Sequence, residues 1–204
     1  MKIEKYELTK KIKYNIYLSN GEVITLDERV ITENELLLKK EIDKELYDKL
    51  INENKIYELI DIGIKYISIR LRCIKEIKDY LKKKETDSDL IEKVIGKLLK
   101  MGYLDDNRFA KAFIKDKINF TSMGDYKIRM ELERLGVSHQ IIEENILLID
   151  DNIIEDKIKK QIEKQIRTNK KYTGQMLKNK IYTHLVAAGF SKEKVISIIN
   201  NYNF

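Results

Sequence analysis

The apolar positions of residues 102–137 repeat with the period of an α-helix and predict two consecutive helices. The first begins after Asp105 and Asp106, which are favourable N-cap residues. Its helical spacing is set by Phe109, Ala112, Phe113 and Lys117. The second opens at residues 122–124 and ends at Gly136, a residue that tolerates the left-handed conformation. Its apolar side comprises Tyr126, Ile128, Leu132 and Leu135. A third helix over residues 138–149 completes a three-helix unit.

The same pattern occurs on both sides of this central stretch. Pairs of apolar residues four positions apart recur at offsets of 51 and 53 residues: Ile77 with Leu81, Ile128 with Leu132, and Ile181 with Leu185. An apolar residue follows each pair about nine positions later, at Leu90, Ile141 and Val195. Gly136 and Gly189 close the second helix of copies two and three, whereas copy one has Glu85. Self-similarity at this period predicts a tandem array of three helical units.

The pattern predicts a mainly α-helical protein in which the three units form an elongated, curved array. The predicted boundaries are 1–42 for an N-terminal segment, then 43–104, 105–150 and 151–204 for repeats one, two and three. In repeat one, Asp43 caps a long helix that ends near Ile67, and helices over 73–84 and 87–101 follow. Repeat three is predicted to consist of helices over 151–168, 173–188 and 191–202.

The N-terminal segment has the period of a β-strand instead. Tyr14, Ile16 and Leu18 alternate with polar residues, and the Asn20-Gly21 pair favours a tight hairpin turn before residues 23–26 return. Residues 3–8 are predicted to add a third strand, and a short helix is predicted over 33–40. A sheet this small needs the helices for its stability. It acts either as a structural cap on the array or as a docking edge.

Composition narrows the class of protein. The 204 residues include 40 Lys and Arg and 34 Asp and Glu, and there is no proline. No apolar run approaches the roughly 18 to 20 residues of a membrane span, and no apolar signal segment opens the chain, so we expect a cytoplasmic location. Cys73 is the single cysteine and has no internal disulfide partner, which fits a reducing compartment. We interpret it as an inert, partly covered thiol.

The sequence offers little support for catalysis. His139 and His184 lie far apart, and a single cysteine leaves no zinc-ligand spacing. Asp105 and Asp106 are adjacent on a helix and so do not share a face, which makes N-capping the better explanation than acid–base chemistry. No glycine-rich phosphate loop is present. We therefore expect no enzymatic activity, no metal and no cofactor.

Positive charge is concentrated in the third repeat. Residues 151–204 hold 11 basic and 5 acidic residues, and this excess equals the net charge of +6 of the whole chain. The contact candidates here are Lys157, Lys160, Lys164, Arg167, Lys170, Lys171 and Tyr172. Such a stretch attracts polyanions, and Tyr172 offers a ring for base stacking. The alternative is a solvated lysine face. Lysines without ordered arginine forks bind without sequence choice.

A second basic group lies at the turns and on the central helices. Its members are Arg70, Arg72, Lys75, Lys127, Arg129 and Arg134. Arginine suits bidentate contacts with carboxylates or phosphates of a partner, and local helix pairing is the alternative. Arg70 and Arg72 flank Leu71, which we expect to turn inward. Arg108, beside Phe109, is expected to fasten neighbouring units together.

Three strings of residues resemble a known family. They are Arg70-x-Arg72 followed by Lys75-Glu76-Ile77, then residues 102–110 reading GYLDDNRFA, then Gly124-x-x-x-Ile128-x-x-x-Leu132-x-x-x-Gly136-Val137. Together they resemble the RecX family, regulators of the RecA recombinase. The resemblance runs from about residue 40 to the C-terminus, and the hairpin is similar to that of longer Gram-positive members. Cys73 departs from the usual Ser or Thr cap, and repeat three matches only in pattern.

The resemblance implies a non-enzymatic, monomeric modulator of homologous recombination, DNA repair and the SOS response. Such a protein would lie in the groove of the RecA–DNA filament and inhibit ATP hydrolysis and strand exchange, with weak, non-specific DNA contacts. Two alternatives remain open: a general nucleic-acid-binding helical protein, and a helical-repeat adaptor for another protein. The repeat positions expected to carry the fold are Ile77, Leu81, Asp105, Asp106, Arg108, Phe109, Ile128, Leu132, Gly136, Ile181, Leu185 and Gly189.

Overall fold

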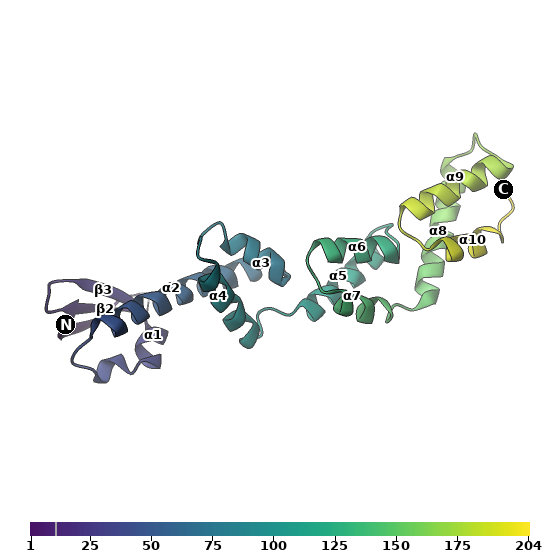
Figure 1. Ribbon diagram of the computed structural model, residues 1–204. Helices are drawn as coiled ribbons and strands as arrows, with labels where there is room; N and C mark the ends of the chain where they lie inside the picture. Colours follow the sequence, from purple (N-terminus) through teal and green to yellow (C-terminus); the bar gives the residue numbers. More distant parts are fainter. Residues whose placement is uncertain (11) are drawn as a thin grey trace. The chain divides into compact units, whose positions relative to one another are not determined.

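The computed structural model describes residues 1–10 and 12–204, which form two compact units. The first unit comprises Met1–Arg70 and Ile77–Tyr103, and the second comprises Leu71–Glu76 and Leu104–Phe204. The boundary falls inside helix α3 (Ile74–Leu81), whose first turn belongs to the second unit and whose remainder belongs to the first. Figure 1 shows helices throughout, with a small sheet at the N-terminal end of the first unit.

The strands of the first unit form an antiparallel sheet in the order β1-β2-β3. Their bounds are β1 (Ile3–Leu8), β2 (Lys13–Leu18) and β3 (Val23–Asp27). Ile16 of the central strand pairs with Tyr6 and Ile24, and Gly21 has a φ of +80° in the turn before β3. The predicted hairpin and the additional strand are therefore confirmed. One face of the sheet is buried against the following helices through Ile16, Leu18, Ile24 and Leu26.

The helix predicted over residues 33–40 was wrong in position. Helix α1 (Glu28–Glu33) begins directly after β3, because the Asp27 carboxylate accepts the backbone N–H of Arg29 and caps the helix early. Asn34 ends α1, and Glu35 takes a φ of +49°, which an α-helix cannot continue through. Only a short 3₁₀ turn, η1 (Leu36–Leu38), follows.

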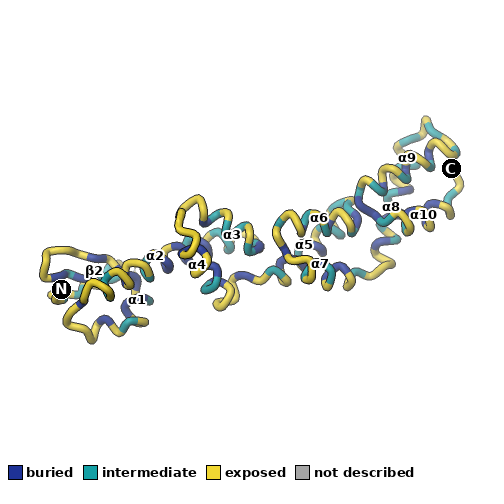
Figure 2. The backbone as a smooth tube through the Cα atoms, viewed as in Figure 1, coloured by how far each residue is buried: buried dark blue, intermediate teal, exposed yellow. Residues whose placement is uncertain are grey.

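Repeat one packs around the long helix α2 (Lys44–Ile67), which Asp43 caps by accepting the N–H of Leu46. Helix α4 (Ser88–Lys100), capped by Asp87, lies against α2. Gly63 allows this approach, because a Cβ there would lie 3.1 Å from Cδ1 of Leu98. Figure 2 shows buried stretches along α2 between exposed ones.

The end of α3 differs from the glycine-closed helices of the other repeats. Glu85 donates its backbone N–H to the carbonyl of Leu81, and its carboxylate accepts the N–H groups of Thr86 and Asp87. Lys55 on α2 pairs with the same carboxylate at 2.6 Å. These hydrogen bonds, that of Lys55 first, lower the pKa of Glu85. Glu85 thus ties the end of α3 to both α2 and α4.

The second unit contains repeats two and three, each with its own apolar core. Repeat two consists of α5 (Asp106–Phe120), α6 (Asp125–Arg134) and α7 (His139–Ile146). Repeat three consists of α8 (Asp151–Thr168), α9 (Gly174–Ala187) and α10 (Lys192–Ile199). Ile149 is partly buried against both cores and so belongs to the link between the repeats.

The middle helix of every repeat buries its periodic pair completely. Ile77, Leu81, Ile128, Leu132, Ile181 and Leu185 all have 0% exposure. One assignment made from periodicity, the apolar position of Tyr126, was wrong. Tyr126 is 56% exposed, because it sits in the first turn of α6, and Ile141 is partly buried against the core while its neighbour Ile142 is at 0% exposure.

Candidate functional site

The start of α3 packs against the end of α6 within the second unit. The Cys73 thiol donates to the carbonyl of Leu135 at 3.2 Å, and Nζ of Lys75 donates to the carbonyl of Arg134 at 3.0 Å. Gly136, with a φ of +80°, lies under the Lys75 side chain, whose Cδ would be 2.7 Å from a Cβ at this position. A glycine is therefore required here both for its backbone conformation and for the contact.

Asp106 replaces the Ser or Thr cap that α3 lacks. The Asp106 carboxylate, in the first turn of α5, accepts the N–H of Ile74 at 2.9 Å. Cys73 has 0% exposure, and this burial raises its pKa to about 11, so the thiol stays neutral. Burial likewise raises the pKa of Asp106. Asp106 thus joins α5 to the start of α3, while Asp105 caps α5 itself through the N–H of Arg108.

A second junction of the same kind joins repeats two and three. The N–H of Gly124, before α6, donates to the carbonyl of Ala188 at 2.8 Å, and the N–H of Tyr126 donates to the carbonyl of Gly189 at 3.0 Å. A Cβ on Gly124 would lie 2.3 Å from the backbone carbon and oxygen of Gly189. A Cβ on Gly189 would lie 2.4 Å from Cβ of Lys127. Here two backbones touch, and a side chain at either glycine would separate them.

The two junctions use equivalent positions. The two donors, Cys73 and Gly124, are 51 residues apart, and the two acceptors, Leu135 and Ala188, are 53 residues apart. The start of one middle helix therefore sits on the end of the next, first α3 on α6 and then α6 on α9. The first junction uses side-chain donors to backbone carbonyls and the second uses backbone hydrogen bonds, and close packing at a glycine accompanies both, so each junction favours one geometry.

Lys157 fastens repeat three to repeat two by a different contact. Its ammonium group donates to the carbonyls of Lys117 and Ile118 at 3.2 and 2.9 Å, which are among the last carbonyls of α5. Burial lowers the pKa of Lys157 to about 8. Lys157 was predicted as a partner contact, and the structure instead places its ammonium in an internal link.

The depressed pKa of Lys157 makes stability depend on pH. Below pH 8 both the folded and the unfolded chain carry the proton, whereas between about 8 and 10.5 only the unfolded chain does. Stability contributed by this group therefore rises with pH across that window. After allowance for solvent screening, urea unfolding should show the free energy of unfolding rising by about 1 kcal/mol across this window. The variant Lys157→Met should not show this rise. If the free energies of unfolding of wild type and Lys157→Met differed by the same amount at both ends of the window, this prediction would be contradicted.

A basic stripe runs along α8, formed by Lys157, Lys160, Lys164 and Arg167 at helical spacing. Lys160, Lys164 and Arg167 are exposed, and within the described chain none of the three has an acidic partner. Lys159, on a different side of the helix, pairs with Glu155 and Asp156 at 3.7 and 3.8 Å. The stripe thus leaves three cations available to a polyanion.

Tyr172 is already engaged within repeat three. Its ring packs partly on the third-repeat core, and Nζ of Lys180 and of Lys171 lie 4.3 and 5.1 Å from its centroid. Stacking on a base would require the ring to exchange a cation–π contact. Lys170 is exposed nearby. The surface of this repeat that is available to bind a polyanion is therefore formed by the cations more than by the tyrosine.

The arginine candidates differ in how far their side chains are buried. Arg129 on α6 makes a two-pronged ion pair with Glu143 on α7, at 2.6 and 3.3 Å. The Arg72 side chain is 10% exposed and pairs with Glu76 at 3.3 Å. Arg70 is exposed, and Leu71 is 40% exposed, so the inward turn expected for Leu71 was wrong. The residues around position 72 bury the arginine stem and leave the leucine outside.

The remaining candidates lie at the junctions of the stacked helices. Lys127 and Arg134 are exposed at the two ends of α6, beside Gly189 and Lys75 respectively. Arg108 is exposed on α5. Lys75 and Arg134 therefore lie together at the junction of α3 with α6, whereas Lys127 lies at the junction of α6 with α9.

Other kinds of site find no support in the described part of the chain. No three or more His, Cys, Asp or Glu side chains gather there as a metal site requires. None of the helices in the described ranges has the length and apolar content to cross a bilayer.

Comparisons with known proteins agree with this architecture. Residues 60–98 match the model of the first three-helix domain of RecX, and residues 105–144 match that of the second. The regulatory protein RecX of Finegoldia magna is 36% identical over 99% of this chain and 100% of its own length. That of Halalkalibacterium halodurans is 31% identical over 88% of this chain and 69% of its own length.

Solved structures show the same fold. A crystal structure of regulatory protein RecX superposes with a TM-score of 0.89, at 24% identity, over 98% of this chain and 99% of that one. RecX from Lactobacillus salivarius superposes with a TM-score of 0.68, at 26% identity, over 71% of this chain and 94% of that one.

The three-helix units define a helical-repeat protein. Within that class, the relatives and the domain matches place the chain in one family. It belongs to the RecX family of regulatory proteins.

Proposed function

We propose that this chain regulates the RecA recombinase by binding the RecA–DNA filament and restraining ATP hydrolysis and strand exchange, without catalysing a reaction itself. The observation that carries the proposal is membership of the RecX family over nearly the full chain. Regulation of recombination and DNA repair in the cytoplasm is the corresponding cellular role.

The junctions of the second unit support a mechanical mode of action. A body held by backbone contacts at Gly124 and Gly189 resists bending, so it fits one relative arrangement of neighbouring filament subunits better than others. A ligand shifts a conformational equilibrium only through such a difference in affinity. If the filament must change arrangement during each ATP cycle, a stiff clamp on adjacent subunits slows the cycle.

Co-sedimentation tests the binding step. RecA filaments assembled on single-stranded DNA with a non-hydrolysable ATP analogue should carry the chain into the pellet, and RecA without DNA should not. Adding salt should release part of the chain, because exposed cations contribute to the contact. Failure of the chain to pellet with filaments at any salt concentration would refute the proposal.

Direct nucleic-acid binding is a second candidate function, and the α8 stripe favours it. Three exposed cations on one helix face, without acidic partners in the described residues, can neutralise phosphates along a strand. The lysines bring charge but no base readout, so this binding would be independent of sequence.

A further inference from the structure

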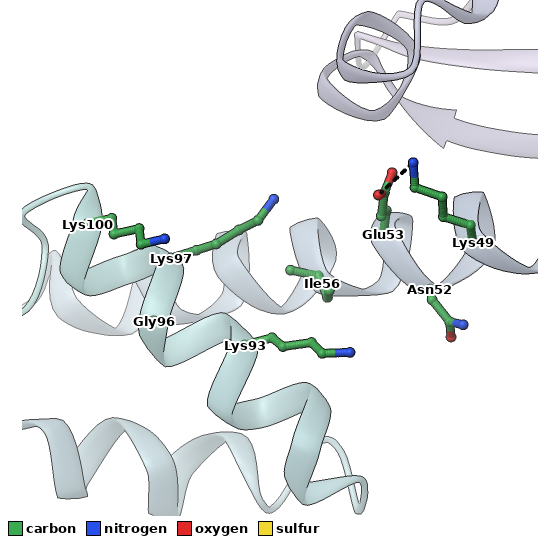
Figure 3. Close-up of a pocket in the computed structure, with 8 residues that line it drawn as sticks. All are labelled: Lys49, Asn52, Glu53, Ile56, Lys93, Gly96, Lys97 and Lys100. Carbon is green, nitrogen blue, oxygen red and sulfur yellow. Dashed lines mark ion pairs between the residues drawn. The ribbon is translucent and has the colours of Figure 1, made fainter. Parts of the chain in front are cut away.

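The first unit contains a groove between α2 and α4 that the regulation of a filament does not explain (Figure 3). It encloses about 570 Å³. The α4 side of the groove is basic, and an apolar side chain of α2 forms part of its wall. The lining residues are Lys49, Asn52, Glu53, Ile56, Lys93, Gly96, Lys97 and Lys100.

Gly96 is the residue that folding does not explain. It lies inside α4, where glycine costs about 1 kcal/mol relative to alanine. A Cβ at this position would meet no atom within 4 Å, so neither packing nor backbone conformation requires glycine. Gly63 on α2 contrasts with it, because Leu98 lies 3.1 Å from its Cβ position. Because Gly96 has no side chain, the groove remains open at this position.

The groove carries an excess of positive charge. Lys93, Lys97 and Lys100 lie on one face of α4 at helical spacing, as Figure 3 shows. Lys97 donates to the hydroxyl of Tyr57 at 2.9 Å, and Lys49 pairs with Glu53 at 3.7 Å. Lys93 and Lys100 have no acidic partner among the described residues. Two cations therefore remain available at the rim, and one carboxylate is present.

We propose that this groove binds an acidic peptide segment of a partner protein. An apolar side chain of the segment would lie over Ile56 in the space left by Gly96, and flanking carboxylates would pair with Lys93 and Lys100. A peptide fits better than a phosphate backbone for two reasons. The Glu53 carboxylate can accept backbone N–H groups, which a peptide has and a phosphate strand lacks, and an apolar side chain of a peptide can fill the space that Gly96 leaves open. The volume lies within the range of about 300 to 1,000 Å³ that is usual for ligand sites.

The test measures fluorescence anisotropy of a labelled short peptide of aspartate and glutamate with one central leucine, titrated with the full chain. Binding should weaken about tenfold in Lys93→Gln/Lys100→Gln, given two exposed ion pairs, and stay unchanged in Lys82→Gln/Lys83→Gln, a matched change elsewhere in the unit. Gly96→Leu should abolish binding by filling the groove. Because a Cβ there meets no atom within 4 Å and leucine has a higher helix propensity than glycine, urea unfolding should show Gly96→Leu to be at least as stable as wild type.

Several outcomes would overturn the proposal. These are no binding of the acidic peptide, equal binding of the same peptide with asparagine and glutamine, or unchanged binding in a folded Gly96→Leu. If Gly96→Leu is less stable than wild type, the test rests on Lys93→Gln/Lys100→Gln alone. Peptide affinity equal to that of wild type in this variant then overturns the proposal. If single-stranded DNA binds with the same dependence on Lys93 and Lys100, the ligand is nucleic acid and the peptide proposal fails. No RecA is present in the assay, so the result is separate from that of the filament experiments.

Discussion

Replacing Gly124 with alanine is expected to destabilise the chain by about 3 kcal/mol, at the upper end of what overpacking usually costs. The new Cβ would lie 2.3 Å from backbone atoms of Gly189, which cannot move aside as a flexible side chain could. The φ of Gly124 is −83°, ordinary for any residue, so the loss would come from the contact and not from backbone strain. Urea unfolding of the full chain measures the effect.

The control for Gly124→Ala is Gly96→Ala, where the added methyl group meets nothing and improves helix propensity. It should stabilise the chain by about 0.5 to 1 kcal/mol. Hydrogen exchange gives a local readout, because the amides of Gly124 and Tyr126 donate across the junction and should exchange faster in Gly124→Ala. Unchanged stability and unchanged exchange in that variant would show that the repeats do not rely on this junction.

The variant Lys160→Gln/Lys164→Gln/Arg167→Gln is expected to weaken binding of single-stranded DNA by roughly a hundredfold at low salt. Each cation that contacts a phosphate adds about 0.7 to the slope of log affinity against log salt, so the slope should fall by about 2. The three side chains are exposed, and so the fold should be unaffected. Fluorescence anisotropy over a series of salt concentrations measures both quantities.

The matched control for the stripe is Lys82→Gln/Lys83→Gln/Lys84→Gln, which removes the same charge from exposed positions of the first unit. If both triple variants lose affinity equally, net charge and not the stripe governs binding. If neither loses affinity, direct DNA binding through α8 is excluded.

The repeat architecture was predictable because its signal is local and periodic. Ile77, Ile128 and Ile181 head pairs spaced four residues apart, and an α-helix must bury such a pair on one face. Asp43 and Asp105 were correctly assigned as caps for a similar reason, since capping involves only the next few residues. The hairpin followed from alternation and from the Asn20-Gly21 turn.

The junctions were not predictable, because they join residues far apart in sequence. Gly136 and Gly189 were recognised as helix ends, but their second use, the close approach of another helix, depends on which segment arrives there. Asp106 was assigned to the start of its own helix, and its bond to Ile74 spans 32 residues. The internal role of Lys157 was missed because a lysine in a basic stretch looks like surface. Only the absence of an acidic neighbour at its helical spacing hinted at another acceptor.

The proposed role rests on a stacked-repeat body that acts on the RecA filament. The most direct test is the rate of ATP hydrolysis by RecA from the same organism on single-stranded DNA, with increasing amounts of the chain. The wild-type chain should lower the rate of hydrolysis progressively. Under conditions in which Gly124→Ala remains folded, this variant should lower the rate less at equal concentration. A rate of hydrolysis that stays constant at every concentration of the wild-type chain would contradict the account.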